Sequence, residues 1–161
     1  MTDFDFFTGT WDVANRRLDK WLCGSDSWDE FPGVTTGISL FGGGAHFDEI
    51  VFPTLGRRGL TLRLYDPARG EWSLYWAASR DGLLQPPVTG RFADGIGEFV
   101  GDDEHEGRPV RVRYRWSGMS ATTARWEQAF SVDDGASWET NWIMDMTRRA
   151  TPHAFAAVGP A

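Results

Sequence analysis

The sequence contains few of the residues that mark several common classes of protein. Of its 161 residues, one is a cysteine, Cys23, and one is a lysine, Lys20. A single cysteine cannot form an internal disulfide, which is typical of a protein kept in the reducing cytoplasm. No feature of the sequence places a base beside Cys23, so we do not expect it to act as a nucleophile.

Basic residues and long apolar runs are scarce as well. The 16 Lys and Arg are outnumbered by 23 Asp and Glu, giving a net charge of -7. This balance argues against binding to nucleic acid or to an anionic membrane surface. No apolar run approaches the length needed to cross a bilayer, and residues 1–7 lack the basic start of a signal peptide. We therefore expect a soluble, cytoplasmic protein that has neither a nucleic-acid nor a membrane partner.

Aromatic residues and glycine are abundant instead, with 9 Trp, 11 Phe and 19 Gly. Aromatic side chains favour strands, and glycine supplies the positive φ of tight turns. Alternation of apolar and polar residues predicts about ten strands, with only a short helical turn at residues 4–7. The strand segments are 10–20, 27–31, 35–41, 46–52, 60–65, 71–77, 88–92, 97–101, 110–116, 124–132 and 138–147.

Turn residues separate these segments. Asp94-Gly95 is a two-residue hairpin signal, residues 66–70 contain a proline and a closing glycine, and the acidic residues 102–107 are expected to form a solvated loop. Successive hairpins make neighbouring strands antiparallel, and closure removes the unpaired edges. The sequence therefore predicts an all-β fold, a single antiparallel up-and-down β-barrel of about ten strands. Residues 1–149 would form this domain, and residues 150–161 a loosely ordered C-terminal tail.

The sharpest local motif surrounds Asp133. Ser131, Asp133, Gly135 and Trp138 have the spacing of the Asp box, a pattern found on hairpins of sialidases and of many unrelated β proteins. In such a turn the carboxylate accepts hydrogen bonds from backbone amides, and glycine adopts the left-handed conformation. We interpret the motif as structural.

The opening of the chain resembles that of calycins, the lipocalin-like β-barrels. Gly9-Thr10-Trp11 matches their G-x-W motif at the first strand, and the resemblance implies that Trp11 plugs the base of the barrel. It also implies that an arginine of the last strand, Arg148 or Arg149, lies over that ring. Three further stretches resemble the uncharacterised bacterial DUF1579-like group of calycins: residues 72–76, 125–131 and 138–142. With them the resemblance covers most of the chain. The group implies a fold and a cavity, and no settled activity.

Nitrobindins, which are haem-binding relatives, provide a minor alternative. Their opening contains further glycines that are absent after Trp11, and the corresponding histidine here, His153, follows the last predicted strand. The three histidines show no metal-ligand spacing. We therefore expect no metal and no cofactor.

Alternation along the strands also predicts which side chains face the interior. On one face we expect Trp11 with Asn15 and Arg17, and on another Trp138 with Trp142. The predicted ligand contacts are Asn15, Arg17, Trp28, Asp48, Arg63, Trp76, Tyr114, Trp126, Gln128 and Trp142. Such a wall, rich in indoles and with few polar groups, suits a flat and partly polar ligand. The alternative is that the same aromatic side chains fill the barrel.

Three functional hypotheses remain open. The first is binding of a small hydrophobic or aromatic metabolite. The second is a cofactor-free isomerase, cyclase or hydrolase in the same cavity, based on an inward pairing of Asp48 or Glu49 with Arg63. The two carboxylates face opposite sides of one strand, so at most one of them shares the interior with the arginine. The third is an interaction protein that forms a homodimer through exposed aromatic side chains.

Overall fold

Ten strands and two short 3-10 helices make up residues 2–150, the part of the chain that the computed structural model describes. The helices are η1 (Asp5–Phe7) and η2 (Phe41–Gly43). The strands are β1 (Gly9–Leu18), β2 (Trp28–Leu40), β3 (Ala45–Phe52), β4 (Arg57–Asp66), β5 (Glu71–Ala78), β6 (Val88–Ala93), β7 (Ile96–His105), β8 (Arg108–Ser117), β9 (Thr123–Ser131) and β10 (Glu139–Arg148).

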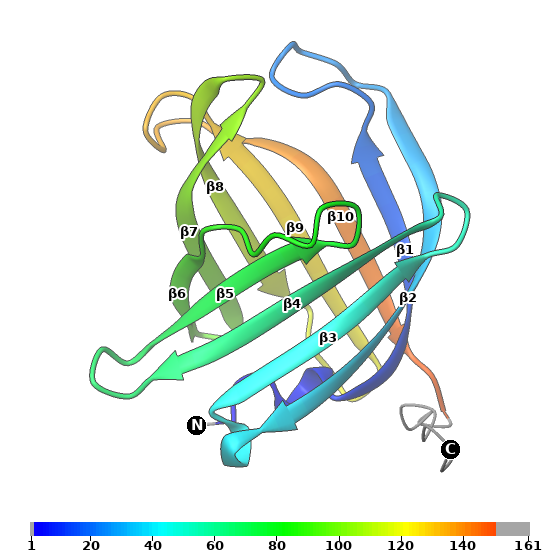
Figure 1. The fold of residues 1–161 in the computed structure, drawn as a ribbon, viewed down its shortest axis with the longest axis vertical. Coiled ribbons are helices and arrows are strands. Elements are labelled where there is room, and N and C mark those ends of the chain that lie inside the picture. The colour runs from blue at the N-terminus through cyan, green and yellow to red at the C-terminus, as the bar shows by residue number, and fades with distance from the viewer. Residues whose placement is uncertain (1, 151–161) are drawn as a thin grey trace.

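The strands form one closed barrel (Figure 1). Each strand pairs antiparallel with its neighbours in sequence, and β1 also pairs with β10, which completes the circle. Closure gives each of these strands a partner on both sides, which is how an antiparallel sheet of this size limits the exposure of backbone donors and acceptors. The predicted all-β, up-and-down barrel of about ten strands is confirmed.

Strand β2 differs from the prediction of two separate strands at residues 27–31 and 35–41. It runs unbroken through Pro32 and Gly33. Strand β3 pairs with β2 only from Val34 onward, so Pro32 has a neighbouring strand on one side alone. A missing backbone donor is tolerated at such a position, because proline fits a strand where one edge is unpaired.

Strand β7 also extends further than predicted. The acidic residues expected in a loop continue the strand to His105, and the turn contains only Glu106 and Gly107. Asp102 lies opposite Arg111 of β8, and the two side chains approach to 2.8 Å. Opposite charges across the ladder favour this extension.

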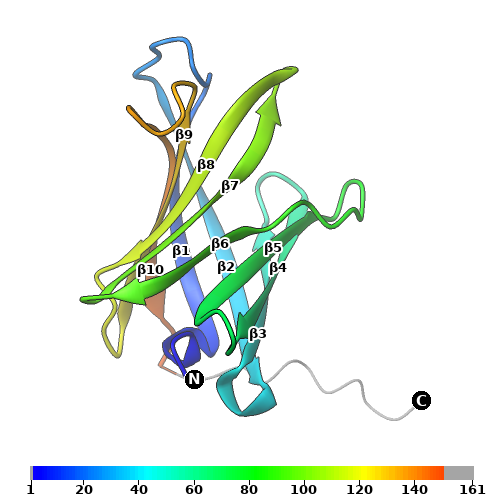
Figure 2. The same cartoon turned by 90° about the vertical axis from the view of Figure 1, so that its left-hand side faces the viewer.

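Helix η1 closes one end of the barrel, and Figure 2 shows it beneath the strands, beside the N-terminus. Its buried Phe7 and the preceding Phe4 pack edge-on against rings from the barrel wall. Phe4 contacts Trp72 with ring centres 4.9 Å apart, and Phe7 contacts Trp116 at 4.8 Å. The predicted helical turn at residues 4–7 thus forms the plug of the barrel.

Arg148 holds the seam between β1 and β10 at this closed end. Its guanidinium lies 4.3 Å from the centre of the Trp11 ring. Its two terminal nitrogens donate to the carbonyls of Phe6 and Thr8, which ties the last strand to the plug. Of the two arginines that the calycin resemblance offers, Arg148 therefore lies over Trp11, whereas Arg149 forms an ion pair outside the barrel.

The turn between β9 and β10 has the hydrogen bonds expected of its motif. The Asp133 carboxylate accepts bonds from the Ser137 hydroxyl at 2.5 Å, the Ser137 amide at 2.8 Å and the Ser131 hydroxyl at 2.7 Å. These donors lower the pKa of Asp133 to about 2. Gly135 adopts φ 89°, which glycine tolerates without strain.

No helix among residues 2–150 has the length and apolar character required to cross a membrane. The tail predicted for residues 150–161 lies outside the described residues except for residue 150.

Candidate functional site

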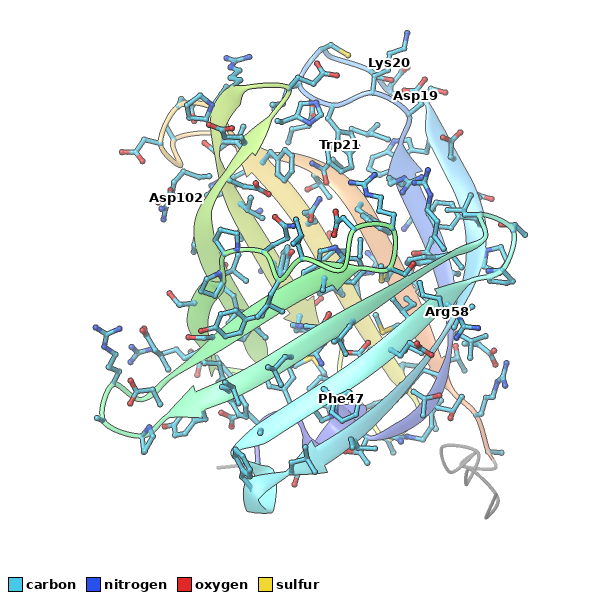
Figure 3. All side chains as sticks on the ribbon, in the orientation of Figure 1. Asp19, Lys20, Trp21, Phe47, Arg58 and Asp102 are labelled. Carbon is cyan, nitrogen blue, oxygen red and sulfur yellow. The ribbon has the colours of Figure 1, made fainter. Side chains whose placement is uncertain are left out.

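A cavity of about 480 Å³ occupies the barrel interior. Phe7 of η1 lines its floor, and its mouth lies at the opposite end, among residues such as Trp21, Arg57 and Asp103. Figure 3 shows the labelled Trp21 and Asp102 towards this end. The volume falls within the range of small-molecule sites, about 300–1,000 Å³. The tryptophans therefore do not fill the interior.

A glycine on β4 helps to keep the space open. A Cβ atom at Gly59 would lie 1.9 Å from the ring of Trp76 on β5. The indole therefore lies against the β4 backbone and does not cross the barrel. Any larger residue at position 59 would displace it, because real Cβ atoms do not approach so closely.

Indole rings form much of one wall. Trp126 on β9 lies edge-on to Trp142 on β10, with ring centres 5.9 Å apart, and Tyr114 on β8 lies 5.1 Å from Trp126. The Trp142 Nε1 donates to Asn15 Oδ1 at 3.0 Å. Asn15 is buried behind this wall and fixes the orientation of the indole. Other apolar side chains of the lining include Ile50, Phe52, Leu74, Val88, Val112, Met144 and Met146.

The deeper part of the cavity contains a buried ion pair. Arg63 Nη1 donates to Asp48 Oδ1 at 2.5 Å, and the two side chains are only 4% and 6% exposed. The other carboxylate oxygen of Asp48 accepts the Thr35 hydroxyl at 2.6 Å. Asp48 is therefore the inward carboxylate, and Glu49 faces outward, where it pairs with Arg58 at 3.0 Å.

His46 completes this cluster as a neutral ring. Arg63 Nη1 lies 3.1 Å from His46 Nδ1. A guanidinium can only donate, so Nδ1 accepts and the ring proton resides on Nε2. Burial, and then the charge of Arg63, lower the pKa of His46 to about 3, against an opposing effect of the Phe7 carbonyl. The ring is therefore an uncharged positioning group at neutral pH.

Aromatic rings surround the Arg63 guanidinium at the cavity floor. Its carbon lies 5.0 Å from the centre of Phe4, 5.4 Å from Phe7 and 5.7 Å from Trp116. Ring faces stabilise a cation without supplying hydrogen-bond acceptors. Asp48 consequently provides the neutralising charge for Arg63.

Tyr114 and Gln128 add two polar groups to the wall. They lie opposite each other in the β8–β9 ladder. Burial raises the pKa of Tyr114, and the negative charge of Asp103 acts in the same direction. The phenol therefore stays protonated and offers a donor. Gln128 Nε2 donates to Asn141 Oδ1 at 2.9 Å, which holds the amide in place.

Eight of the ten predicted ligand contacts line the cavity: Arg17, Asp48, Arg63, Trp76, Tyr114, Trp126, Gln128 and Trp142. Asn15 lies behind the wall, as described above. Trp28 is 37% exposed at the start of β2 and is not a lining residue. The buried members of that strand all stand at odd-numbered positions: Phe31, Gly33, Thr35 and Gly37. Trp28 stands at an even-numbered position and therefore faces outward.

Trp138 and Trp142 do not share a face, contrary to the prediction. The β9–β10 register shifts between Thr140 and Trp142, so Asn141 is the extra residue of a bulge. A bulge reverses the alternation on either side of it. Trp142 therefore lines the cavity, whereas Trp138 stacks outside on Arg113, whose guanidinium carbon is 4.6 Å from the ring centre.

Several residues at the mouth were not among the predicted contacts, and Trp21 and Arg57 are two of them. Trp21 lies in the β1–β2 connection, and its indole packs edge-on against Phe130 at 5.1 Å. The alternation used for strands does not predict the direction of a side chain in a loop. Arg57 could have been found, because it shares an alternation with Thr61 and Arg63 of β4, both of which line the cavity.

No family model matches this chain, and no curated protein matches it in sequence. The geometry of the barrel is compatible with a calycin-like fold. Within residues 2–150, no group of three His, Cys, Asp or Glu side chains is arranged to hold a metal ion. His153, on which the haem alternative depended, lies outside the described residues.

Proposed function

We propose that this protein is a calycin-like binding module that holds a small, largely apolar molecule with an aromatic character. The cavity of about 480 Å³, open at one end and walled by Trp76, Trp126 and Trp142, carries the proposal. Indoles provide contact area at little conformational cost, and a few fixed polar groups orient the ligand.

The polar groups favour a neutral partner in the deep part of the cavity. Arg63 is already neutralised by Asp48, and Tyr114 remains protonated. A buried charge without a counter-ion is costly, so a second anion beside Asp48 would be disfavoured. Hydroxyl or carbonyl groups of the ligand match this environment.

The test uses N-phenyl-1-naphthylamine, a neutral aromatic probe whose fluorescence rises in apolar surroundings. We expect saturable binding to the unmodified protein, with quenching of tryptophan emission. Thr61→Trp fills the cavity and is expected to weaken binding by at least about tenfold, since the probe loses its space. The matched control is Leu60→Trp, which adds an indole to the outer face of the same strand. Equal binding by both variants would refute a site inside the barrel.

A second candidate function is catalysis in the same cavity. The observation that favours it is the Asp48–Arg63 pair, which lines the cavity and is held by Thr35 and His46. Such a preorganised pair can accept or donate a proton beside an apolar substrate. The native ligand would first be identified by native mass spectrometry of protein purified from its host. Turnover of that ligand that is retained in Asp48→Asn would exclude this role.

A further inference from the structure

The cavity mouth contains a cation, Arg17, that has no close ion pair among the described residues, although Asp29 lies opposite it in the β1–β2 ladder. Arg17 lines the cavity at the end of β1, half-buried, and forms neither a hydrogen bond nor a close ion pair with another residue in the range 2–150. Its guanidinium carbon lies 4.8 Å from the centre of Phe31 and 5.0 Å from that of Trp142. These rings position the charge and leave its N–H groups without an acceptor in the part of the chain that the structure describes.

A second arginine reinforces this charge. Arg57 shares the inward alternation of β4 with Thr61 and Arg63, lines the cavity, and has no close acidic partner among the described residues. Burial, and then the charge of Arg57, lower the pKa of Arg17, and Asp29 opposes them. Two unpaired guanidinium groups facing one opening form a site that a bound anion would stabilise.

Another part of the mouth carries negative charge. Asp103 and Glu104 lie on β7, which is four strands from β1 and three strands from β4 in the strand order, and both line the mouth. Asp103 Oδ1 accepts the Glu104 amide at 2.7 Å, which leaves both carboxylate charges in place. An anionic ligand is therefore attracted to the Arg17 side of the mouth and repelled from the other side.

We infer that the ligand is an amphipathic aromatic acid, whose anionic group is held at the mouth by Arg17 and Arg57 while its apolar body lies among the indoles below. This rests on the proposed function and adds the charge and the orientation of the ligand. The deeper Arg63 does not compete for the acid group, because Asp48 already neutralises it.

The test compares two probes with the same skeleton. 8-Anilinonaphthalene-1-sulfonate is N-phenyl-1-naphthylamine with one added sulfonate, so the ratio of their dissociation constants isolates the anionic group. At low ionic strength we expect the sulfonate to bind at least about tenfold more tightly, with a preference that decreases as salt screens the arginines. Arg17→Gln is expected to remove most of this preference, measured as the ratio of the two dissociation constants.

Neighbouring arginines provide a matched control. Arg57→Gln is expected to reduce the preference, whereas Arg58→Gln, which removes the same charge from a residue already paired with Glu49, is not. Asp103→Asn is expected to strengthen sulfonate binding. Circular dichroism and urea unfolding would establish that each variant is folded.

The outcomes separate the two proposals. Equal affinity for both probes, or an equal loss of both in Arg17→Gln, would overturn the anion site and leave the apolar cavity standing. Failure of both probes to bind the unmodified protein would overturn the proposed function and the anion site together. Weaker sulfonate binding in Asp103→Asn would also contradict the inference, because it would show that the acidic wall does not repel the ligand.

Discussion

Removing the charge of Asp48 tests whether the buried ion pair is as important as its surroundings indicate. Asp48→Asn preserves the shape of the side chain and an oxygen that can accept from Arg63. The Thr35 hydroxyl can also accept from the new amide, because its single hydrogen can turn to the Glu49 carbonyl, which lies 3.1 Å away. The substitution therefore removes the neutralising charge and preserves most of the hydrogen bonds.

The magnitude follows from burial. Both side chains of the pair are at most 6% exposed, and the other stabilising groups around Arg63 within residues 2–150 are ring faces and a neutral imidazole. Leaving one charge of a buried pair uncompensated costs about 3–5 kcal/mol. For a domain of this size each kcal/mol lowers the melting temperature by about 2–4 °C, so a fall of roughly 10 °C is expected.

The control lies one residue away. Glu49→Gln removes the same charge from the same strand, but its pair with Arg58 lies on the outer face, where the side chains are 46% and 59% exposed. Such pairs contribute less than about 1 kcal/mol. Urea unfolding followed by tryptophan fluorescence and circular dichroism would measure both variants. A free-energy change for Asp48→Asn as small as that for Glu49→Gln would refute the reasoning. Asp48→Asn combined with Arg63→Met is expected to recover much of the lost stability.

Three further expectations concern substitutions of single residues. His46 has a pKa of about 3 in the fold and 6.5 as the ordinary value. The unfolded chain therefore binds its proton first, and stability should fall by up to about 1.4 kcal/mol per pH unit as the pH drops from 6.5 towards 3. Unfolding curves of the unmodified protein and of His46→Gln should differ in this slope, and parallel pH profiles would exclude the effect. Gly59→Ala should displace Trp76 into the cavity, cost about 1–3 kcal/mol and weaken binding of the neutral probe; unchanged probe affinity would show that the ring has another place to go. Arg148→Lys should lose the fork that reaches two carbonyls and the stacking on Trp11, at a cost of about 2 kcal/mol in urea unfolding. Wild-type stability in that variant would mean that the seam does not depend on the guanidinium.

Much of this architecture was predictable because local rules suffice for it. Alternation and turn residues predicted the strands, and the absence of helical pattern left closure as the way to satisfy the edges. The same alternation placed Arg17 and Trp126 on the cavity wall. The sequence left two adjacent carboxylates, Asp48 and Glu49, as possible partners of Arg63. The register between β3 and β4 decides between them, because it determines which face of β3 Arg63 shares.

What could not be predicted depends on irregular or non-local geometry. The bulge at Asn141 reverses the alternation of β10, and nothing in the local sequence marks it. Trp21 reaches the mouth from a loop. The open volume itself depends on Gly59, since a residue without a side chain determines where the Trp76 ring lies. The ligand cannot be predicted from the sequence, because the shape of its site depends on the bulge, the loop and the glycine together.

Closure through β1 and β10 also affects the order in which the barrel forms. Arg148 donates hydrogen bonds to the carbonyls of Thr8 and Phe6, which lie 140 and 142 residues earlier in the chain. Contacts of such separation form slowly, because a long loop must be ordered before they stabilise anything. During synthesis, β1 and β9 therefore present open edges until the last strand emerges from the ribosome. This interval is the one in which the chain is most exposed to aggregation, so substitutions in β10 should reduce the yield of folded protein more than equally destabilising substitutions in β4.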